Sequence, residues 1–275
     1  MSRINTGSRV NFDTVANVLV IIPTHSNAET LPQALRSIQN QSFESLEVQI
    51  IADGASPEII EIAQTFSMKD QRFHLQYHQK SVRRGEEHRH DSILSSPAQF
   101  ITYLADDDLF LPHHVQYMVE NLEGRDFANQ RPTFINRHDH IWCMPTDISL
   151  ESSRTWHLGQ QVRNSISLSG VMHTKDSYLR LAEGWAPTPM SFPWTDLYMW
   201  QKFLRRDDFN FITTPRCTIL KFLGASNRYD EQKIEQNQRW FGEMQDPDWV
   251  QKWDQRVERC HQIASAEAFV QLTNS

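Results

Sequence analysis

The sequence predicts an α/β domain with a mainly parallel central sheet, followed by a helical C-terminal extension. In the first half, short β-rich runs alternate with helical patterns, which is typical of parallel sheets. The first of these runs, residues 18–23, is continuously apolar, as expected for a strand covered on both faces. Acidic residues follow two of the runs directly, at Asp53 and at Asp106–Asp108, on the edge where open α/β sheets bind ligands.

Four strands and their following helices account for this half. The strands are expected at residues 18–23, 46–52, 73–78 and 100–105. The first helix is predicted from Thr30-Leu-Pro-Gln33, which has the form of a capping box, and the second from Ser56 and Pro57 as N-cap and first helical residue. A third, short helix ends near Leu94, and a fourth opens at Pro112.

The second half is less regular. Its pattern predicts β-like stretches, two helices and a Pro-rich loop, in chain order at residues 133–144 (β), 166–173 (β), 175–182 (helix), 186–193 (loop), 196–205 (helix) and 209–222 (β). A polar segment with scattered tryptophans follows and is expected to be helical. We therefore expect one domain over residues 1–224, with halves at 17–122 and 123–224, and an extension over 225–275.

Composition limits the class of protein. Of 275 residues, 27 are Lys or Arg and 34 are Asp or Glu, so the formal charge of −7 argues against a nucleic-acid partner. The three cysteines form no C-x-x-C motif, and their odd number suits a reducing compartment. Residues 1–17 are polar and lack the apolar core of a secretion signal, so a cytoplasmic location is expected.

The Asp106–Asp108 triplet is the sharpest local feature. Three adjacent carboxylates repel one another unless a cation neutralises them. Mg²⁺ or Mn²⁺ suits such a site, because these ions are commonly held by one or two carboxylates together with substrate phosphates. The alternative is an acidic, solvated loop that stabilises the N-terminus of the helix after Pro112.

Four motifs in order resemble the nucleotide-sugar half of the family-two inverting glycosyltransferases. They are Val18-Leu-Val-Ile-Ile-Pro-Thr24, Ile51-Ala-Asp-Gly-Ala55, Gly85-Glu-Glu-His-Arg89 and Tyr103-Leu-Ala-Asp-Asp-Asp-Leu-Phe-Leu-Pro112. The resemblance covers about residues 17–225 and is strongest up to residue 122. It implies the GT-A fold, a three-layer, Rossmann-like arrangement.

The resemblance also implies roles for individual residues. Those expected to bind the nucleotide sugar are Pro23, Thr24, Asp53, Arg89, Asp106 and Asp107, with Asp53 at the base or ribose. The family's last metal-binding aspartate lies four residues before the proline, which corresponds to Asp108, so the resemblance implies Mn²⁺ or Mg²⁺ at that residue.

Transfer with inversion needs a carboxylate that takes the proton of the attacking hydroxyl. The family places this base at the start of a helix beyond the acidic motif, which corresponds to Asp196; the alternative for Asp196 is a first-turn acid that only stabilises its helix. Trp194 offers a flat face for a sugar, and His173 lies on a strand that borders the acceptor site in similar enzymes.

The sequence thus predicts a metal-dependent inverting glycosyltransferase that uses a nucleoside-diphosphate sugar, with UDP favoured. The acceptor is expected to be a hydroxyl of a glycan, lipid or protein, and the aromatic extension suggests a homodimer or peripheral membrane contact. One alternative is a non-catalytic nucleotide-sugar-binding protein of the same fold. Another is a nucleotidyltransferase, although residues 23–27 lack the glycine that such enzymes use in their phosphate loop.

Overall fold

A seven-stranded sheet forms the centre of the computed structural model, which describes residues 17–223 and 231–273. The strands lie in the order β10-β6-β9-β4-β1-β2-β3, with bounds β1 (Val18–Thr24), β2 (Leu46–Asp53), β3 (Phe73–His78), β4 (Phe100–Tyr103), β6 (Phe127–Gln130), β9 (Val171–Thr174) and β10 (Phe211–Thr214). β9 runs antiparallel to both β4 and β6, and the other pairs are parallel. The predicted α/β class with a mainly parallel sheet is confirmed.

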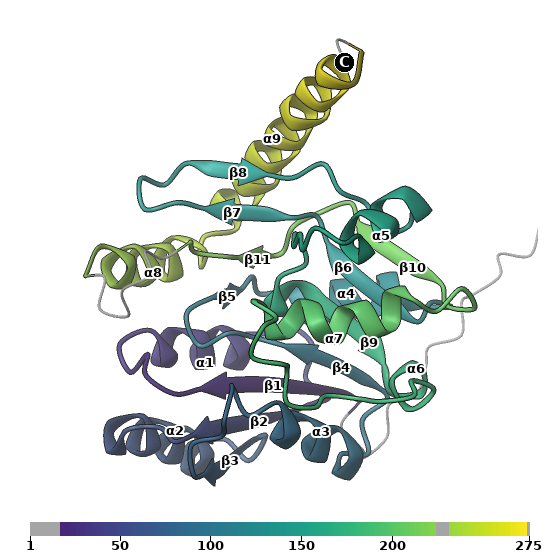
Figure 1. Cartoon of the computed structure of the whole chain (residues 1–275). Helices are drawn as coiled ribbons and strands as arrows, with labels where there is room; N and C mark the ends of the chain where they lie inside the picture. The colour runs from purple at the N-terminus through teal and green to yellow at the C-terminus, as the bar shows by residue number, and fades with distance from the viewer. Residues whose placement is uncertain (1–16, 224–230, 274–275) are drawn as a thin grey trace, which may run out of the picture.

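Helices cover both faces of this sheet (Figure 1). Alternate residues of β1 point to opposite faces, so Val18, Val20 and Ile22 join one hydrophobic core while Leu19 and Ile21 join the other. The first core includes residues of α1 (Leu31–Gln39), α2 (Pro57–Lys69) and α4 (His114–Leu122). The second includes residues of α3 (Glu86–Ser95), α6 (Lys175–Leu179) and α7 (Thr195–Leu204). This is a three-layer arrangement.

Smaller elements follow the acidic triplet and close the chain. β5 (Leu109–Phe110) pairs with β11 (Ile219–Leu220), and β7 (Thr133–Ile135) pairs with β8 (Ile141–Cys143). Helices α8 (Glu231–Glu243) and α9 (Pro247–Thr273) follow β11, and α9, in yellow in Figure 1, extends past the β7–β8 hairpin. Trp240 and Trp253 bury their rings in the same core as α1 and α4.

The length and apolar character that a bilayer span requires are found in none of the helices within residues 17–223 and 231–273. The polar N-terminal residues 1–16 and the expected boundary between residues 224 and 225 lie outside the described residues. The division into a domain and an extension stays a prediction, although α8 and α9 contribute to the same core as the first helices.

The local sequence signals for helix starts predict the start of α2 correctly, but they predict the wrong cap for α1. The Ser56 side chain accepts a hydrogen bond from the Ile59 N–H (3.4 Å), as an N-cap should. The predicted capping box at Thr30 is wrong, because its hydroxyl donates to the carbonyl of Asp106 (2.9 Å) instead of capping α1. A tertiary contact therefore replaces the local one.

The irregular second half departs furthest from the predicted elements. The β-like stretch at 133–144 is a hairpin of two short strands, and the stretch at 209–222 divides into β10 and β11. The run at 166–173 begins as a 3₁₀ turn, η1 (Leu168–Gly170), before β9. Strand β6 and helix α5 (Glu151–Leu158) were not predicted, because both are short and lack clear periodicity.

Tyr103, at the end of β4, connects several buried polar groups in the second core. Its hydroxyl accepts a hydrogen bond from the Trp185 indole N–H (3.0 Å) and lies 2.8 Å from Nε2 of His173. Nδ1 of His173 lies 3.0 Å from the Thr174 carbonyl, so Nδ1 carries the hydrogen and Nε2 accepts from Tyr103. Burial lowers the pKa of His173 to about 4, which keeps the ring neutral near pH 7.

We predict that Tyr103→Phe lowers the free energy of unfolding by about 1–3 kcal/mol, because it leaves two buried polar atoms without a partner. The measurement is urea denaturation at pH 7. Tyr77→Phe is the matched control, since Tyr77 is 59% exposed, and it should change stability by less than about 0.5 kcal/mol. Equal stability of the two variants would show that Tyr103 does not hold this network together.

Candidate functional site

A cavity of about 480 Å³ opens at the carboxyl ends of β1, β2 and β4. Strand order reverses between β1 and β4, so this is the crevice in which open α/β sheets bind ligands. Its volume lies within the range of small-molecule sites. The sequence-predicted residues that line it are Pro23, Thr24, Asp53, Arg89, Asp106, Asp107, Trp194 and Asp196. Asp108 and His173 do not belong to this lining.

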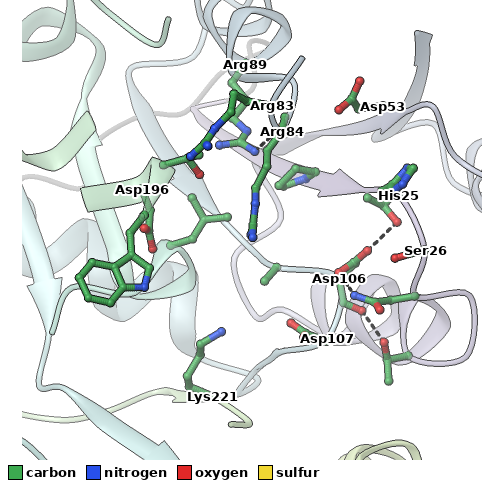
Figure 2. A pocket seen from close by; sticks show the side chains of 18 of the residues that line it. His25, Ser26, Asp53, Arg83, Arg84, Arg89, Asp106, Asp107, Asp196 and Lys221 are labelled. Atoms are coloured by element: carbon green, nitrogen blue, oxygen red, sulfur yellow. Dashed lines mark hydrogen bonds between the residues drawn. The ribbon is translucent and has the colours of Figure 1, made fainter. Parts of the chain in front are cut away.

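Asp106 joins the acidic loop to the turn after β1. Its carboxylate accepts hydrogen bonds from the Thr24 hydroxyl (2.7 Å) and from the Asn27 amide (2.7 Å), shown as dashed lines in Figure 2. Burial and the neighbouring charge of Asp107 raise the pKa of Asp106 to about 7. The hydrogen bond from Thr24 thus helps to position Asp106 at the rim of the cavity.

Asp108 points away from the cavity, into the protein. Its carboxylate accepts from the Ser169 hydroxyl (2.6 Å), the Lys221 ammonium (2.9 Å) and the Phe222 N–H (3.2 Å), and its side chain has no exposed surface. This placement differs from the expectation that Asp108 holds a metal at the donor site, since both of its oxygens already have protein donors.

Asp107 lines the cavity, and its carboxylate forms an ion pair there. Its carboxylate pairs with the ammonium of Lys233, and its backbone carbonyl accepts from the Asn237 amide (3.2 Å). Both partners come from α8. Burial alone would raise the pKa of Asp107, but Lys221 and Lys233 outweigh it and hold the pKa below its usual value.

The β7–β8 hairpin positions α8 over the triplet. Asp139, at the hairpin tip with φ of +60°, accepts hydrogen bonds from three side chains of α8: Gln236 (2.7 Å), Arg239 (2.6 Å) and Trp240 (2.8 Å). The Asp139 carboxylate therefore accepts hydrogen bonds from side chains across about one turn of α8. These bonds hold this polar helix close to the acidic loop.

The donor set of the triplet does not fit a divalent ion in this arrangement. Mg²⁺ and Mn²⁺ need carboxylate oxygens that face the ligand. Here ammonium groups already neutralise Asp107 and Asp108, and the oxygens of Asp106 are hydrogen-bonded. Across residues 17–223 and 231–273, no group of three His, Cys, Asp or Glu side chains is placed to hold a metal. We derive no chemical step through a metal.

Asp53 ends β2 and organises the loop after β3. One oxygen pairs with the Lys80 ammonium and the other accepts from the Ser81 N–H (2.6 Å). Burial alone would raise the pKa of Asp53, but Lys80 and Ser81 outweigh it and hold the pKa below the usual value. Gly54 follows with φ of +63°, in the left-handed region that favours glycine.

Two arginines from the segment before and within α3 enter the cavity. Arg89 is buried, stacks 4.6 Å above the Trp185 ring and donates to the Arg84 carbonyl (2.8 Å). The Arg84 N–H donates to the buried carboxylate of Glu86 (2.8 Å). The guanidinium of Arg84 makes no hydrogen bond or ion pair with other described residues, and Figure 2 shows it extending into the middle of the cavity.

Asp196 lies in the first turn of α7 on the cavity wall (Figure 2). One oxygen accepts from the Leu197 N–H (2.8 Å). Burial raises the pKa of Asp196, while Lys221, Arg89 and Arg84 oppose that shift. A partly desolvated carboxylate with a raised pKa is a stronger proton acceptor than an exposed one. Trp194, 43% exposed, stands beside it on the rim.

The structure places His173 away from the cavity, fully buried and bonded to Tyr103 in the second core, so the expected acceptor-site role has no support from its position. The cationic cavity residues that sequence reasoning missed include Arg84, Lys221 and Lys233. Lys221 had a readable signal, since it is a lone charge in the apolar run Ile219-Leu-Lys-Phe222. Lys233 had none, because it lies in a uniformly polar segment.

Comparison with known proteins gives a family match over most of the sheet. The family model described as "Glycosyl transferase family 2" matches residues 19–181. The chain is 32% identical over 112 residues to an uncharacterized glycosyltransferase of Rickettsia bellii, an alignment that spans 41% of this chain and 16% of that protein. It is 29% identical over 92 residues to a Campylobacter jejuni protein named GalNAc(5)-diNAcBac-PP-undecaprenol beta-1,3-glucosyltransferase, spanning 34% of this chain and 30% of the relative.

The chain therefore aligns with less than a third of the length of these curated relatives. Solved structures that share its fold include the following two. S. aureus TarS 1-349 in complex with UDP-GlcNAc has a TM-score of 0.60 at 12% identity, covering 83% of this chain and 66% of that one. The mannosyltransferase PcManGT from Pyrobaculum calidifontis, in complex with GDP-Man and Mn²⁺, has a TM-score of 0.55 at 13% identity, covering 96% and 77%.

We predict that Asp108→Asn destabilises the fold, because it leaves the Lys221 ammonium without its buried partner. The expected loss is about 2–3 kcal/mol, below the roughly 3–5 kcal/mol of a fully buried pair because the Lys221 side chain is 21% exposed. Glu258→Gln is the control, and its loss should stay under about 1 kcal/mol because the Arg131–Glu258 pair lies at the protein surface. Denaturant unfolding compares them, and equal losses would show that Asp108 is no buried anchor.

Proposed function

Because the chain belongs to glycosyl transferase family 2, which adopts the GT-A fold, we propose that it transfers a sugar from a nucleoside-diphosphate donor to a hydroxyl acceptor with inversion. The observation that carries this proposal is the position of Asp196 in the cavity. Asp196 lies within electrostatic range of Lys221, which also neutralises the acidic triplet, so the carboxylate and the triplet belong to one site.

The proposed reaction is a single displacement. The acceptor oxygen forms a bond to the anomeric carbon while the bond from that carbon to the diphosphate oxygen breaks. Asp196 takes the hydroxyl proton, and the leaving diphosphate keeps the electron pair next to the cationic groups of the cavity. Inversion follows because attack and departure occur on opposite faces of the sugar.

The donor is proposed to carry uridine. TarS, which shares the fold, binds UDP-GlcNAc, whereas PcManGT binds GDP-Man, so the fold accommodates either base. Pro23 and Asp53 line the part of the cavity formed by the ends of β1 and β2, where we propose that base and ribose lie. The Mn²⁺ seen with PcManGT is not carried over, because the triplet of this chain does not fit it.

The acceptor is proposed to approach past Trp194, whose exposed ring offers an apolar face for a sugar or lipid beside Asp196. A glycan, lipid or protein hydroxyl would suit this side. The cytoplasmic location and a dimer or membrane contact through the C-terminal extension, both expected from the sequence, remain part of the proposal.

The test is a screen of UDP- and GDP-sugars. Selective binding raises the melting temperature by mass action, and slow donor hydrolysis should accompany it. Binding without any hydrolysis or transfer would favour a non-catalytic nucleotide-sugar-binding protein. Turnover of a nucleoside triphosphate and a sugar phosphate would favour a nucleotidyltransferase.

We predict that Asp53→Ala weakens UDP binding about tenfold, because it releases Lys80 and Ser81 from the proposed nucleoside end. Isothermal titration calorimetry measures this loss. Asp70→Ala is the control, since Asp70 pairs with Arg72 between α2 and β3, outside the residues that line the cavity. Unchanged UDP affinity in Asp53→Ala would remove Asp53 from the donor site.

We predict that Asp196→Asn keeps donor binding and the melting temperature but lowers the transfer rate about 10²–10⁴-fold, as expected for loss of a positioned base. Donor hydrolysis serves as the assay until an acceptor is known. Asp207→Asn, on the loop after α7, is the control and should react normally. If Asp196→Asn turns over normally but melts several degrees lower, Asp196 only stabilises its helix.

A further inference from the structure

The donor diphosphate needs positive charge, and the acidic triplet offers no free place for a metal. We propose that Arg84 and Lys233 bind the donor diphosphate directly from two walls of the cavity, so that the donor binds without a divalent cation. This inference rests on the proposed function and names the groups that replace the metal expected from the sequence.

Arg84 has the position and the freedom that a phosphate ligand needs. Its backbone is held at both ends, with its N–H on Glu86 (2.8 Å) and its carbonyl on the buried Arg89 (2.8 Å). Its guanidinium, by contrast, extends into the cavity and has no partner among the described residues (Figure 2). A guanidinium presents paired N–H groups that match two phosphate oxygens, so a fixed backbone with a free head suits this ligand.

Lys233 contributes from α8. Its ammonium pairs with Asp107, and the Lys233 side chain is only 17% exposed. An ammonium has three N–H donors, so the pairing with Asp107 leaves donors for phosphate oxygens. The Asp139 contacts fix α8, and with it Lys233, at the triplet. The C-terminal helices thereby contribute to the donor site.

A divalent ion at Asp107 would meet two ammonium groups. It would displace Lys233 from the carboxylate, and it would lie close to Lys221, which is held on the adjacent Asp108. Like charges at such separations repel strongly in a partly desolvated site. Lysine charges at Asp107 and Asp108 therefore replace the cation that the carboxylates would otherwise require.

The decisive experiment is calorimetric titration of UDP into the full chain, once with EDTA and once with Mn²⁺. We expect the two dissociation constants to agree within about threefold. Arg84→Met and Lys233→Met should each weaken UDP about tenfold or more in EDTA, as expected for loss of a charge-assisted hydrogen bond, and should change uridine binding little. Arg36→Met and Lys252→Met, on the exposed surfaces of α1 and α9, are the matched controls and should bind UDP normally.

Each outcome decides between the possibilities. Binding of UDP only with Mn²⁺ overturns this inference but leaves the proposed function standing. Absence of nucleotide binding under both conditions overturns the proposed function, and the inference with it. Loss of uridine and UDP affinity by equal factors in Arg84→Met also overturns the direct contact with the diphosphate.

A double variant distinguishes direct contact between Lys233 and the diphosphate from mere neutralisation of Asp107 by Lys233. Lys233→Met exposes the charge of Asp107, which by itself would repel a diphosphate. Combining it with Asp107→Asn removes that charge. UDP binding that stays weak in the double variant supports a direct contact of Lys233, whereas recovery to the parent affinity shows that Lys233 only neutralises Asp107.

Discussion

The buried carboxylate of Asp108 is the interaction on which the site depends. It joins three segments that lie far apart in the sequence: the loop after β4, the 3₁₀ turn through Ser169, and the end of β11 through Lys221 and Phe222. Ser169 also accepts the Ala105 N–H (3.0 Å), so the same turn supports the first residue of the acidic loop. The region from β9 to α7 supplies Asp196, and the loop after β4 supplies Asp106 and Asp107. The hydrogen bonds of Asp108 therefore fix the positions of these two cavity walls relative to each other.

Lysines neutralise the carboxylates at the strand ends pair by pair. Asp53 has Lys80, Asp107 has Lys233 and Asp108 has Lys221, and each lysine comes from a different segment. Such pairs cost desolvation energy and contribute little net stability, so their value lies in fixing positions. They also leave Arg84 as a cation without a carboxylate partner among the described residues. The charge of Arg84 is therefore available to an anionic ligand in this cavity.

The sequence could predict those features of the fold and the site that depend on residues close together in the chain. The first four strands of the sheet and the residues at the ends of β1, β2 and β4 were predictable, because apolar runs and the residues that follow them are neighbours in the chain. The start of α7 and the place of Asp196 were predictable for the same reason. Lys233 was not, since it reaches the cavity through contacts between α8 and a hairpin tip about a hundred residues earlier in the chain. The burial of His173 in the second core could not be predicted either, because alternation along a strand does not distinguish a side chain that lines a cavity from one in a core.

The acidic triplet shows most clearly that residue spacing does not determine the direction of each side chain. Three consecutive aspartates share one motif, yet Asp106 turns to the loop after β1, Asp107 to α8 and Asp108 to the interior. A family motif assigns a carboxylate to this strand end but does not determine which of three neighbours faces a ligand, because the chain leaves the strand here and successive side chains diverge. The direction is decided by partners elsewhere, namely Thr24, Lys233 and Ser169. Two proteins can therefore share the motif and the fold while different aspartates of the motif face the ligand site.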